Sequence, residues 1–383
     1  MARFGLKSYR FSVAWGRILP SGRGKVNRRG LDFYERMVDL LLERDIRPMV
    51  TLYHWDLPAA LDDEGGWLNP DIADWFTDYA QVLFHALDDR VQLWTTLNEP
   101  WVVSNHGYRI GEMAPGRRSL RETAIVGHHL LRAHASAATL YAESGRHSLG
   151  IVVNLEPKHP TSDSDADRAA AEREHVYQNA YYLDPLFFGR YPEGAAALFG
   201  AAWPGFDDEE VATLMRVPDF VGVNYYTRAV VRAGREDAFL RSERSRPADA
   251  EYTSMGWEIY PSGLTESLRW VTARYGKIPL FVTENGAAFV DPDPADGLVR
   301  DPRRRAYLQR HIEAARDALA SGVDLRGYYA WSLLDNFEWA HGYSQRFGIV
   351  FVDYRTLERT PKESALYYRD VVASNGRSAA TFS

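Results

Sequence analysis

Two glutamates stand beside asparagines at the ends of two β-rich runs. Asn98 and Glu99 close the run TTLNEP, and Glu284 and Asn285 close the run FVTENG. Because an unpaired carboxylate is costly to remove from water, an acid at the end of a buried strand calls for an explanation. The carboxyl ends of parallel strands face the loops where barrel enzymes place their catalytic groups. The sequence therefore offers Glu99 and Glu284 as a pair of catalytic acids.

Enzymes usually cleave a glycosidic bond with a pair of carboxylic acids. One acid protonates the departing oxygen and the other attacks or supports the anomeric carbon, with retention of configuration when the two lie about 5 Å apart. The two glutamates are separated by 284 − 99 = 185 residues, so only a closed sheet brings them together. Arg10, in the first visible strand, is a cation suited to holding one carboxylate ionised. Taken singly, either glutamate is explained equally well as a helix cap or a salt-bridge partner.

Short β-rich runs alternate with longer helical patterns along the chain, which predicts βαβ units and a parallel sheet. We expect seven strands, one fewer than a closed (β/α)8 barrel has. Their predicted ranges are Tyr9–Val13, Arg47–Tyr53, Leu93–Leu97, Leu149–Asn154, Phe220–Asn224, Leu280–Thr283 and Arg326–Trp331. The predicted fold is thus an α/β TIM barrel that is truncated to seven βα units.

Composition narrows the class of protein. The 383 residues are 45% hydrophobic and 25% charged, which favours one large globular domain over 1–383, with a flexible tail at 372–383. A net charge of −7 gives no electrostatic reason to expect nucleic acid or an acidic membrane as partner. The absence of cysteine excludes disulfides and thiolate metal sites. Without a signal-peptide pattern or a long apolar run, the chain is predicted to be cytoplasmic.

The segment 302–322 illustrates how the helices are delimited. Asp301 is expected to cap it, Pro302 suits its first turn, and Gly322 suits its end. Apolar residues three or four apart, including Leu319, are expected to form a buried stripe. Its arginines are then a solvated face, which we favour over a phosphate site.

Six strings together resemble glycoside hydrolase family 1. They are YRFSVAW (9–15), HWDLP (54–58), TLNEP (96–100), VNYYT (223–227), VTENG (282–286) and the long string from Ala330 to Tyr354. They occur in the family's order across nearly the whole chain. Each string alone is modest support, but the six in order are specific to this family.

The resemblance implies roles for individual residues. Glu99 is implied as the acid/base and Glu284 as the nucleophile, with Arg10 and Tyr226 donating to Glu284. The residues implied to bind the sugar are His54 (3-hydroxyl), Trp55, Asn98 (2-hydroxyl), Asn224, Tyr226, Trp331 (platform under the ring), Glu338 and Trp339 (outer hydroxyls) and Phe347. Trp101 and Trp257 resemble residues on the aglycone side. No cofactor and no metal is implied.

The strings also separate activities within the family. Members that act on 6-phosphorylated sugars replace the acid at the position of Glu338 and place a lysine nearby, whereas this chain has no lysine between Trp331 and Phe351. The expected activity is therefore retaining hydrolysis of unphosphorylated β-glucosides such as cellobiose or aryl glucosides, with β-galactosides and β-fucosides as side substrates. The substrate is a small-molecule glycoside. Whether the chain forms a homo-oligomer stays open.

The chain begins, relative to the family, near the approach to the second strand. We therefore expect it to lack the first βα unit and to show weak, lost or oligomer-dependent activity. Two alternatives remain at this point. One is a remnant that binds sugar or a partner without catalysis, and the other is a 6-phospho-β-glycosidase, which Glu338 disfavours.

Overall fold

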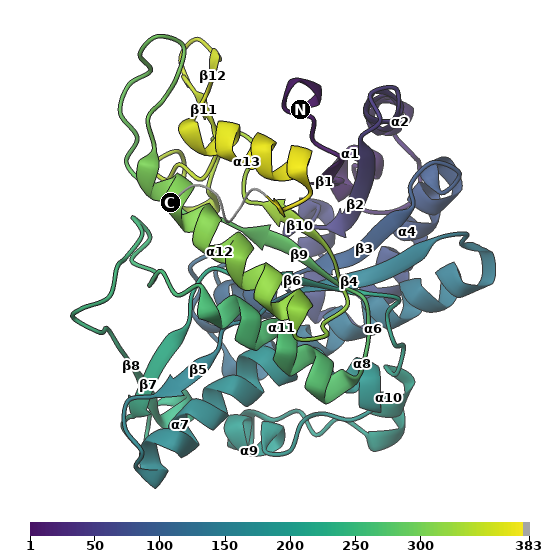
Figure 1. Cartoon of the computed structure of the whole chain (residues 1–383). Coiled ribbons are helices and arrows are strands. Elements are labelled where there is room, and N and C mark those ends of the chain that lie inside the picture. The colour runs from purple at the N-terminus through teal and green to yellow at the C-terminus, as the bar shows by residue number, and fades with distance from the viewer. Residues whose placement is uncertain (378–383) are drawn as a thin grey trace.

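A parallel sheet of seven strands forms the centre of the computed structural model, which describes residues 1–377 (Figure 1). The strands follow each other in chain order around the sheet and all pair in parallel. They are β1 (Ser8–Ser12), β2 (Arg47–Tyr53), β3 (Leu93–Asn98), β4 (Ser148–Asn154), β6 (Val221–Asn224), β9 (Leu280–Asn285) and β10 (Leu325–Ala330). The seven predicted strands are therefore confirmed, with ends that differ by at most two residues.

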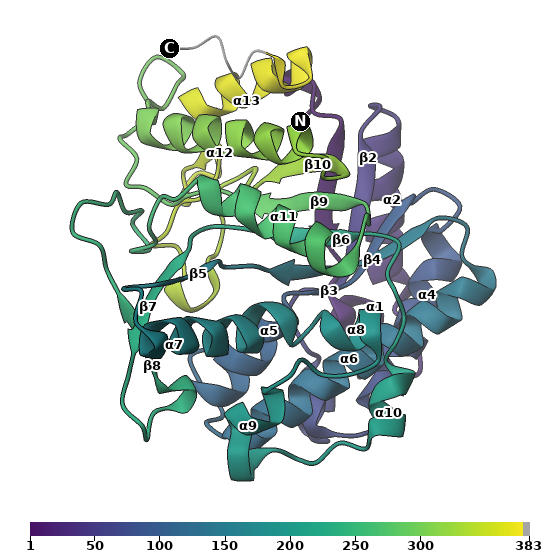
Figure 2. The same cartoon turned by 60° about the horizontal axis from the view of Figure 1, so that its bottom comes forward.

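Helices connect consecutive strands and surround the sheet, as expected for βαβ units (Figures 1 and 2). The longer helices are α2 (Arg28–Leu42), α4 (Ile72–Leu87), α6 (Leu120–Ser144), α7 (Asp165–His175), α11 (Ser262–Tyr275), α12 (Pro302–Ala320) and α13 (Glu363–Ser374). The short ones are α1 (Trp15–Ile18), α3 (Ala59–Asp62), α5 (Pro100–Ser104), α8 (Asp184–Phe188), α9 (Ala195–Phe199) and α10 (Asp208–Thr213). None of the helices within residues 1–377 has the length and apolar character that a membrane crossing requires.

The strands β1 and β10 stand at the two ends of the strand order. Because their side chains meet, the barrel is nearly closed. A side-chain hydrogen bond of 2.6 Å joins the hydroxyl of Ser8 on β1 to that of Tyr329 on β10. Because all seven strands run in the same direction, their carboxyl ends meet at one mouth. At this mouth, Asn224 pairs with Glu284 and Asn98 pairs with Val152 on the neighbouring strands. These pairings fix the positions of the polar strand ends relative to one another.

Two small sheets lie outside the barrel. One consists of β5 (Lys158–Pro160), β7 (Ala229–Ala233) and β8 (Ser242–Ser245), and the other of β11 (Val350–Val352) and β12 (Arg359–Pro361). The first sheet extends the loops that follow β4 and β6, and the second follows the long loop after β10. Both small sheets are therefore parts of βα loops, which lie at the mouth of the barrel.

The helix α12 departs from its predicted pattern in three places. Asp301 makes no capping hydrogen bond; its carboxylate accepts hydrogen bonds from Arg304 and Ser364 instead. Arg304 is only 1% exposed, so the prediction of an entirely solvated arginine face is wrong, and Leu319, expected to be buried, is 52% exposed. Residues 372–374 of the predicted tail form the end of α13, and 378–383 lie outside the described residues.

Candidate active site

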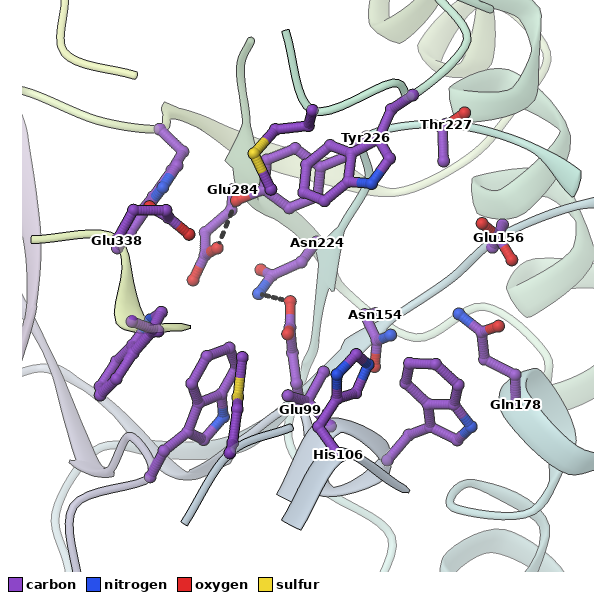
Figure 3. A pocket seen from close by; sticks show the side chains of 18 of the residues that line it. Glu99, His106, Asn154, Glu156, Gln178, Asn224, Tyr226, Thr227, Glu284 and Glu338 are labelled. Carbon is purple, nitrogen blue, oxygen red and sulfur yellow. Dashed lines mark hydrogen bonds between the residues drawn. The ribbon is translucent and has the colours of Figure 1, made fainter. Parts of the chain in front are cut away.

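The carboxyl ends of the strands surround one pocket, and most of the predicted site residues line it (Figure 3). Its wall includes His54, Trp55, Glu99, Trp101, Asn224, Tyr226, Trp257, Glu284, Trp331, Glu338, Trp339 and Phe347. Two predicted residues, Arg10 and Asn98, do not line the pocket but lie behind its wall. Arg10 forms a hydrogen bond with Glu284, Asn98 forms one with Asn224, and the two residues also bond to each other. Residues from β1 to the loop after β10 are thus brought together as expected.

The carboxylate of Glu284 is held on both oxygens. Arg10 Nη1 donates to Oε1 at 2.6 Å in a buried ion pair, and the hydroxyl of Tyr226 donates to Oε2 at 2.6 Å. Burial, followed by the charge of Glu284, raises the pKa of Tyr226 well above its usual range, so its hydroxyl keeps its proton. Contacts of this kind fix the orientation of the Glu284 carboxyl group and the direction of its lone pairs.

The carboxyl group of Glu99 faces the same pocket from β3. Asn224 Nδ2 donates to its Oε1 at 2.6 Å, and Figure 3 draws this contact and the one between Tyr226 and Glu284. Burial raises the pKa of Glu99 to about 8, and the negative charge of Glu284 adds to this effect. Near neutral pH Glu99 therefore keeps its proton, as an acid that protonates a departing oxygen requires.

A polar network behind the wall links the two acids. Asn98 accepts hydrogen bonds on Oδ1 from Arg10 at 2.5 Å and from Asn224 at 3.1 Å, and its amide nitrogen lies 3.2 Å from His54 Nε2. Burial and the nearby Arg10 lower the pKa of His54 well below its usual range, so its ring is neutral. Since Asn98 is fully buried in this network, its contact with a sugar hydroxyl stays a prediction.

Aromatic rings gather at the end of the pocket near Glu338. The ring of His54 stacks with those of Trp331 and Trp339, with centroids 6.0 and 5.8 Å apart, and Trp55 lies 4.7 Å from Trp339. Burial, followed by the charge of Glu284, raises the pKa of Glu338 to about 7. An indole face beside a carboxyl group provides both the apolar surface and the polar contacts that a pyranose ring presents.

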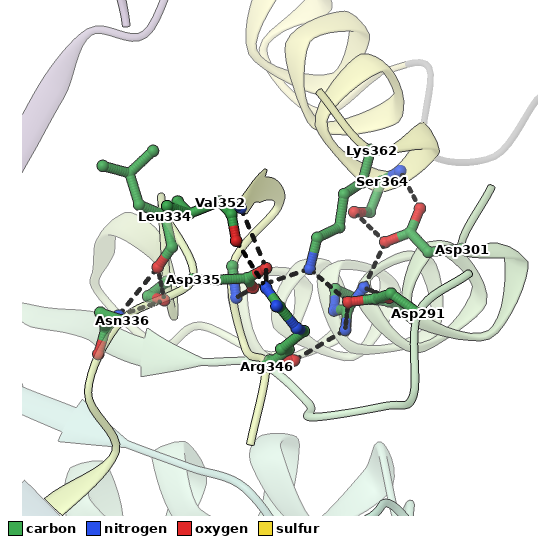
Figure 4. Close-up of polar contacts among 12 residues, drawn as sticks. Asp291, Asp301, Leu334, Asp335, Asn336, Arg346, Val352, Lys362 and Ser364 are labelled. Carbon is green, nitrogen blue, oxygen red and sulfur yellow. Dashed lines mark hydrogen bonds and ion pairs between the residues drawn. The ribbon is translucent and has the colours of Figure 1, made fainter. Parts of the chain in front are cut away.

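A buried ion network anchors the loop that carries Glu338 (Figure 4). Asp335, three residues before Glu338, accepts hydrogen bonds from Lys362 at 2.8 Å, Arg346 at 2.7 Å and the Gly348 backbone at 2.9 Å. The network continues through Asp291, which pairs with both Lys362 and Arg304, and through Asp301, which pairs with Arg304. The three acids and three bases balance in charge, so the loop is fixed without an uncompensated buried ion.

The backbone is unusual at the residues that line the pocket. Glu99, Trp55 and Trp339 have positive φ angles of 49°, 84° and 42°. Such conformations are costly for residues with a side chain, and they concentrate at functional sites. Gly286 is required for another reason: a Cβ at this position would lie 1.7 Å from the carbonyl oxygen of Trp331.

Sequence patterns missed the far end of the pocket, which also contains Asn154, Glu156, Gln178 and Arg244. Asn154 ends β4 as Asn98, Asn224 and Asn285 end their strands, and this shared signal could have identified it. Gln178 lies in the π-helical turn Val176–Ala180, for which no sequence signal was apparent. Trp101 and Trp257 line the pocket together with these residues.

The fold and the pocket agree with a comparison against known families. The model of the family described as glycosyl hydrolase family 1 matches residues 1–377. The chain belongs to glycosyl hydrolase family 1. It is therefore a glycosidase, with the family's fold and with the two glutamates placed at the mouth of its barrel.

Relatives within family 1 cover nearly all of the chain. Beta-glucosidase A of Thermotoga maritima is 45% identical over 376 residues, which are 98% of this chain and 84% of that protein. The 1,4-beta-D-glucan glucohydrolase of Thermotoga neapolitana is 44% identical over 378 residues, 98% of this chain and 84% of its own length. The solved structure of the T. maritima β-glucosidase in complex with deoxynojirimycin matches with a TM-score of 0.95 at 45% identity, covering 98% of this chain and 85% of that one.

The family match covers residues 1–377 and does not confirm the expectation that a first βα unit is missing. The weak activity that was expected on this ground stays a prediction. Within residues 1–377, the principal sheet has seven strands.

Proposed function

We propose that this glycosidase hydrolyses β-D-glucosides with retention of configuration, through a covalent glycosyl intermediate on Glu284. The observation that carries the proposal is the pair of carboxyl groups in different environments. Glu284 receives hydrogen bonds from Arg10 and Tyr226, whereas the pKa of Glu99 is raised to about 8. The names of the relatives, β-glucosidase and glucan glucohydrolase, agree with this substrate class. In this proposal residues 1–377 act as one catalytic domain.

The reaction has two steps. In the first, Glu284 attacks the anomeric carbon while Glu99 gives its proton to the departing oxygen. In the second, Glu99, now ionised, takes a proton from water as that water attacks the same carbon and releases Glu284. Asn224, which donates to Glu99, keeps its carboxyl group oriented through both steps.

Two measurements test this mechanism directly. A 2-fluoro-β-glucoside with a good leaving group is expected to stop the enzyme by forming a stable ester, and peptide mass spectrometry should find the added mass on Glu284. Proton NMR of the first product should show the β anomer. Label on another residue, or an α product, would overturn the mechanism. A folded protein that takes up no label and releases no glucose would instead be a sugar-binding remnant.

The rate should depend on pH through the proton of Glu99. Since Glu99 must be protonated in the first step, kcat/KM for an alkyl β-glucoside is expected to fall as the pH rises through about 8, tenfold for each further unit. The check is a profile of kcat/KM from pH 6 to 10. In Glu99→Gln, this limb should disappear from the residual activity. A limb that persists in this variant would assign the titration to another group.

The carboxyl group of Glu338 should discriminate against phosphorylated sugars. A phosphate on the 6-hydroxyl would meet this acid in a buried site, which is expected to lower kcat/KM for the 6-phospho-glucoside on the order of 100-fold below the plain glucoside. The variant Glu338→Gln removes the acid but nearly keeps the shape of the side chain. It should reduce the difference between the kcat/KM values for the two substrates. An enzyme that prefers the phosphorylated substrate would restore the 6-phospho-β-glycosidase alternative.

A further inference from the structure

The end of the pocket opposite Glu338 is walled by a cluster of paired charges. Glu156 follows β4, Lys158 begins β5, Glu174 lies on α7 and Arg244 lies on β8. Lys158 contacts Glu156 and lies 3.6 Å from Glu174, and Arg244 pairs with the same two acids at 2.7 and 3.2 Å. The two cations and two anions balance, so the cluster has no net charge to attract an ionic ligand.

One side chain of this wall keeps an unused donor. Lys158 Nζ donates to Gln178 Oε1 at 2.6 Å. Because an ammonium group has only donors, this contact fixes which end of the Gln178 amide is oxygen and turns the nitrogen the other way. Within residues 1–377, the contact with Lys158 is the one hydrogen bond of the Gln178 side chain, so its Nε2 is left without a partner at the pocket that Gln178 lines. In Figure 3 its nitrogen lies on the side that faces Asn154.

The backbone that carries Gln178 is also fixed. The side chain of Asn179 accepts a hydrogen bond from the Glu156 backbone at 3.1 Å and donates to the Glu156 carbonyl at 2.9 Å. Lys158 is 1% exposed, so its position is set by packing as well as by its ion pairs. The donor of Gln178 is thus prepared in advance, without a cost for orienting it when a ligand arrives.

We propose that Gln178 is a specificity-determining residue whose Nε2, directed by Lys158, donates to a hydroxyl oxygen of a sugar aglycone such as the second glucose of cellobiose. The inference rests on the proposed function and extends it to the second half of the substrate. A sugar ring offers both a hydroxyl acceptor for Gln178 and an apolar face for Trp101, which also lines the pocket and whose ring lies 6.2 Å from that of Tyr177, the residue before Gln178. Lys158 acts through Gln178 as a positioning residue.

The test compares two alkyl glucosides that differ only in the aglycone: cellobiose, whose aglycone is glucose, and methyl β-D-glucoside. In Gln178→Met, which keeps the length of the side chain but removes the donor, the ratio of kcat/KM for cellobiose to that for methyl glucoside is expected to fall about fivefold. The matched control is Gln81→Met, on the exposed surface of α4, which should leave the ratio as it is.

A double-mutant cycle separates this role from a merely structural one. Lys158→Met frees the amide to rotate and should also lower the ratio, but it should add nothing in the Gln178→Met background. Independent, additive losses would overturn the positioning role, and an unchanged ratio in Gln178→Met would overturn the inference. If wild-type protein failed to hydrolyse methyl glucoside at all, the proposed function would fail instead.

Discussion

Replacement of Glu284 by glutamine is expected to lower kcat for every β-glucoside by at least about 10^4-fold, because Glu284 is the group that we propose to form the glycosyl intermediate. The amide keeps the size of the carboxyl group but cannot attack the anomeric carbon. Unlike the losses expected elsewhere in the pocket, this one should not depend on the leaving group. Steady-state rates with methyl, nitrophenyl and dinitrophenyl glucosides measure it.

The control for this variant is binding rather than turnover. The amide keeps a carbonyl oxygen that can accept from Arg10, and the Tyr226 hydroxyl can accept a hydrogen bond from the amide nitrogen. The pocket should therefore keep its shape, and a glucose-like inhibitor should still protect the protein against thermal unfolding. Residual activity above about 1% of wild type, in a sample free of contaminating enzyme, would assign the nucleophile elsewhere.

Replacement of Glu99 by glutamine is expected to act in proportion to the leaving group. General acid catalysis contributes about 10^2- to 10^4-fold, so methyl β-glucoside should lose a factor in this range. A dinitrophenolate needs no proton to depart, so its release should be nearly unaffected in the first step. The second step lacks its base, and the glycosyl ester should accumulate.

The two steps are separated by rapid-mixing kinetics with the dinitrophenyl glucoside. Glu99→Gln should give a burst of dinitrophenolate close to one equivalent, followed by a slow steady rate that added azide accelerates. Azide needs no general base, so the product should be the β-glucosyl azide. A uniform loss for all leaving groups, without a burst, would contradict the assignment of Glu99 as the acid/base.

The strands and the acids at their ends could be predicted because both leave local marks in the sequence. A buried strand is short and apolar, and a polar pair such as Asn98 and Glu99 at its end has no simple structural explanation. Of the contacts to the two acids, Arg10 was named from its place in the first strand and Tyr226 only through the family resemblance. The hydrogen bond from Asn224 to Glu99 was not predicted. Their distances depend on closure of the sheet, which no local pattern encodes.

The failures of prediction have a common physical origin. Arg304 lies on a helix face that looks solvated, yet Asp291 and Asp301 supply the charges that allow it to be buried. Gln178 is an ordinary helical residue in the sequence, and only Lys158, twenty residues earlier, makes it a directed donor. In both cases a partner distant in the chain, or across a turn, decides what the side chain does.

The ion network around Asp335 determines which part of the site is completed last during synthesis. Both glutamates at the barrel mouth precede residue 290, whereas the cation that joins Asp291 to Asp335 is Lys362, next to the final helix. A nascent chain can therefore close most of its barrel while the segment around Glu338 still lacks its last counter-charge. Competence to hold a sugar should mature at the end of synthesis, after the chemical machinery is already in place.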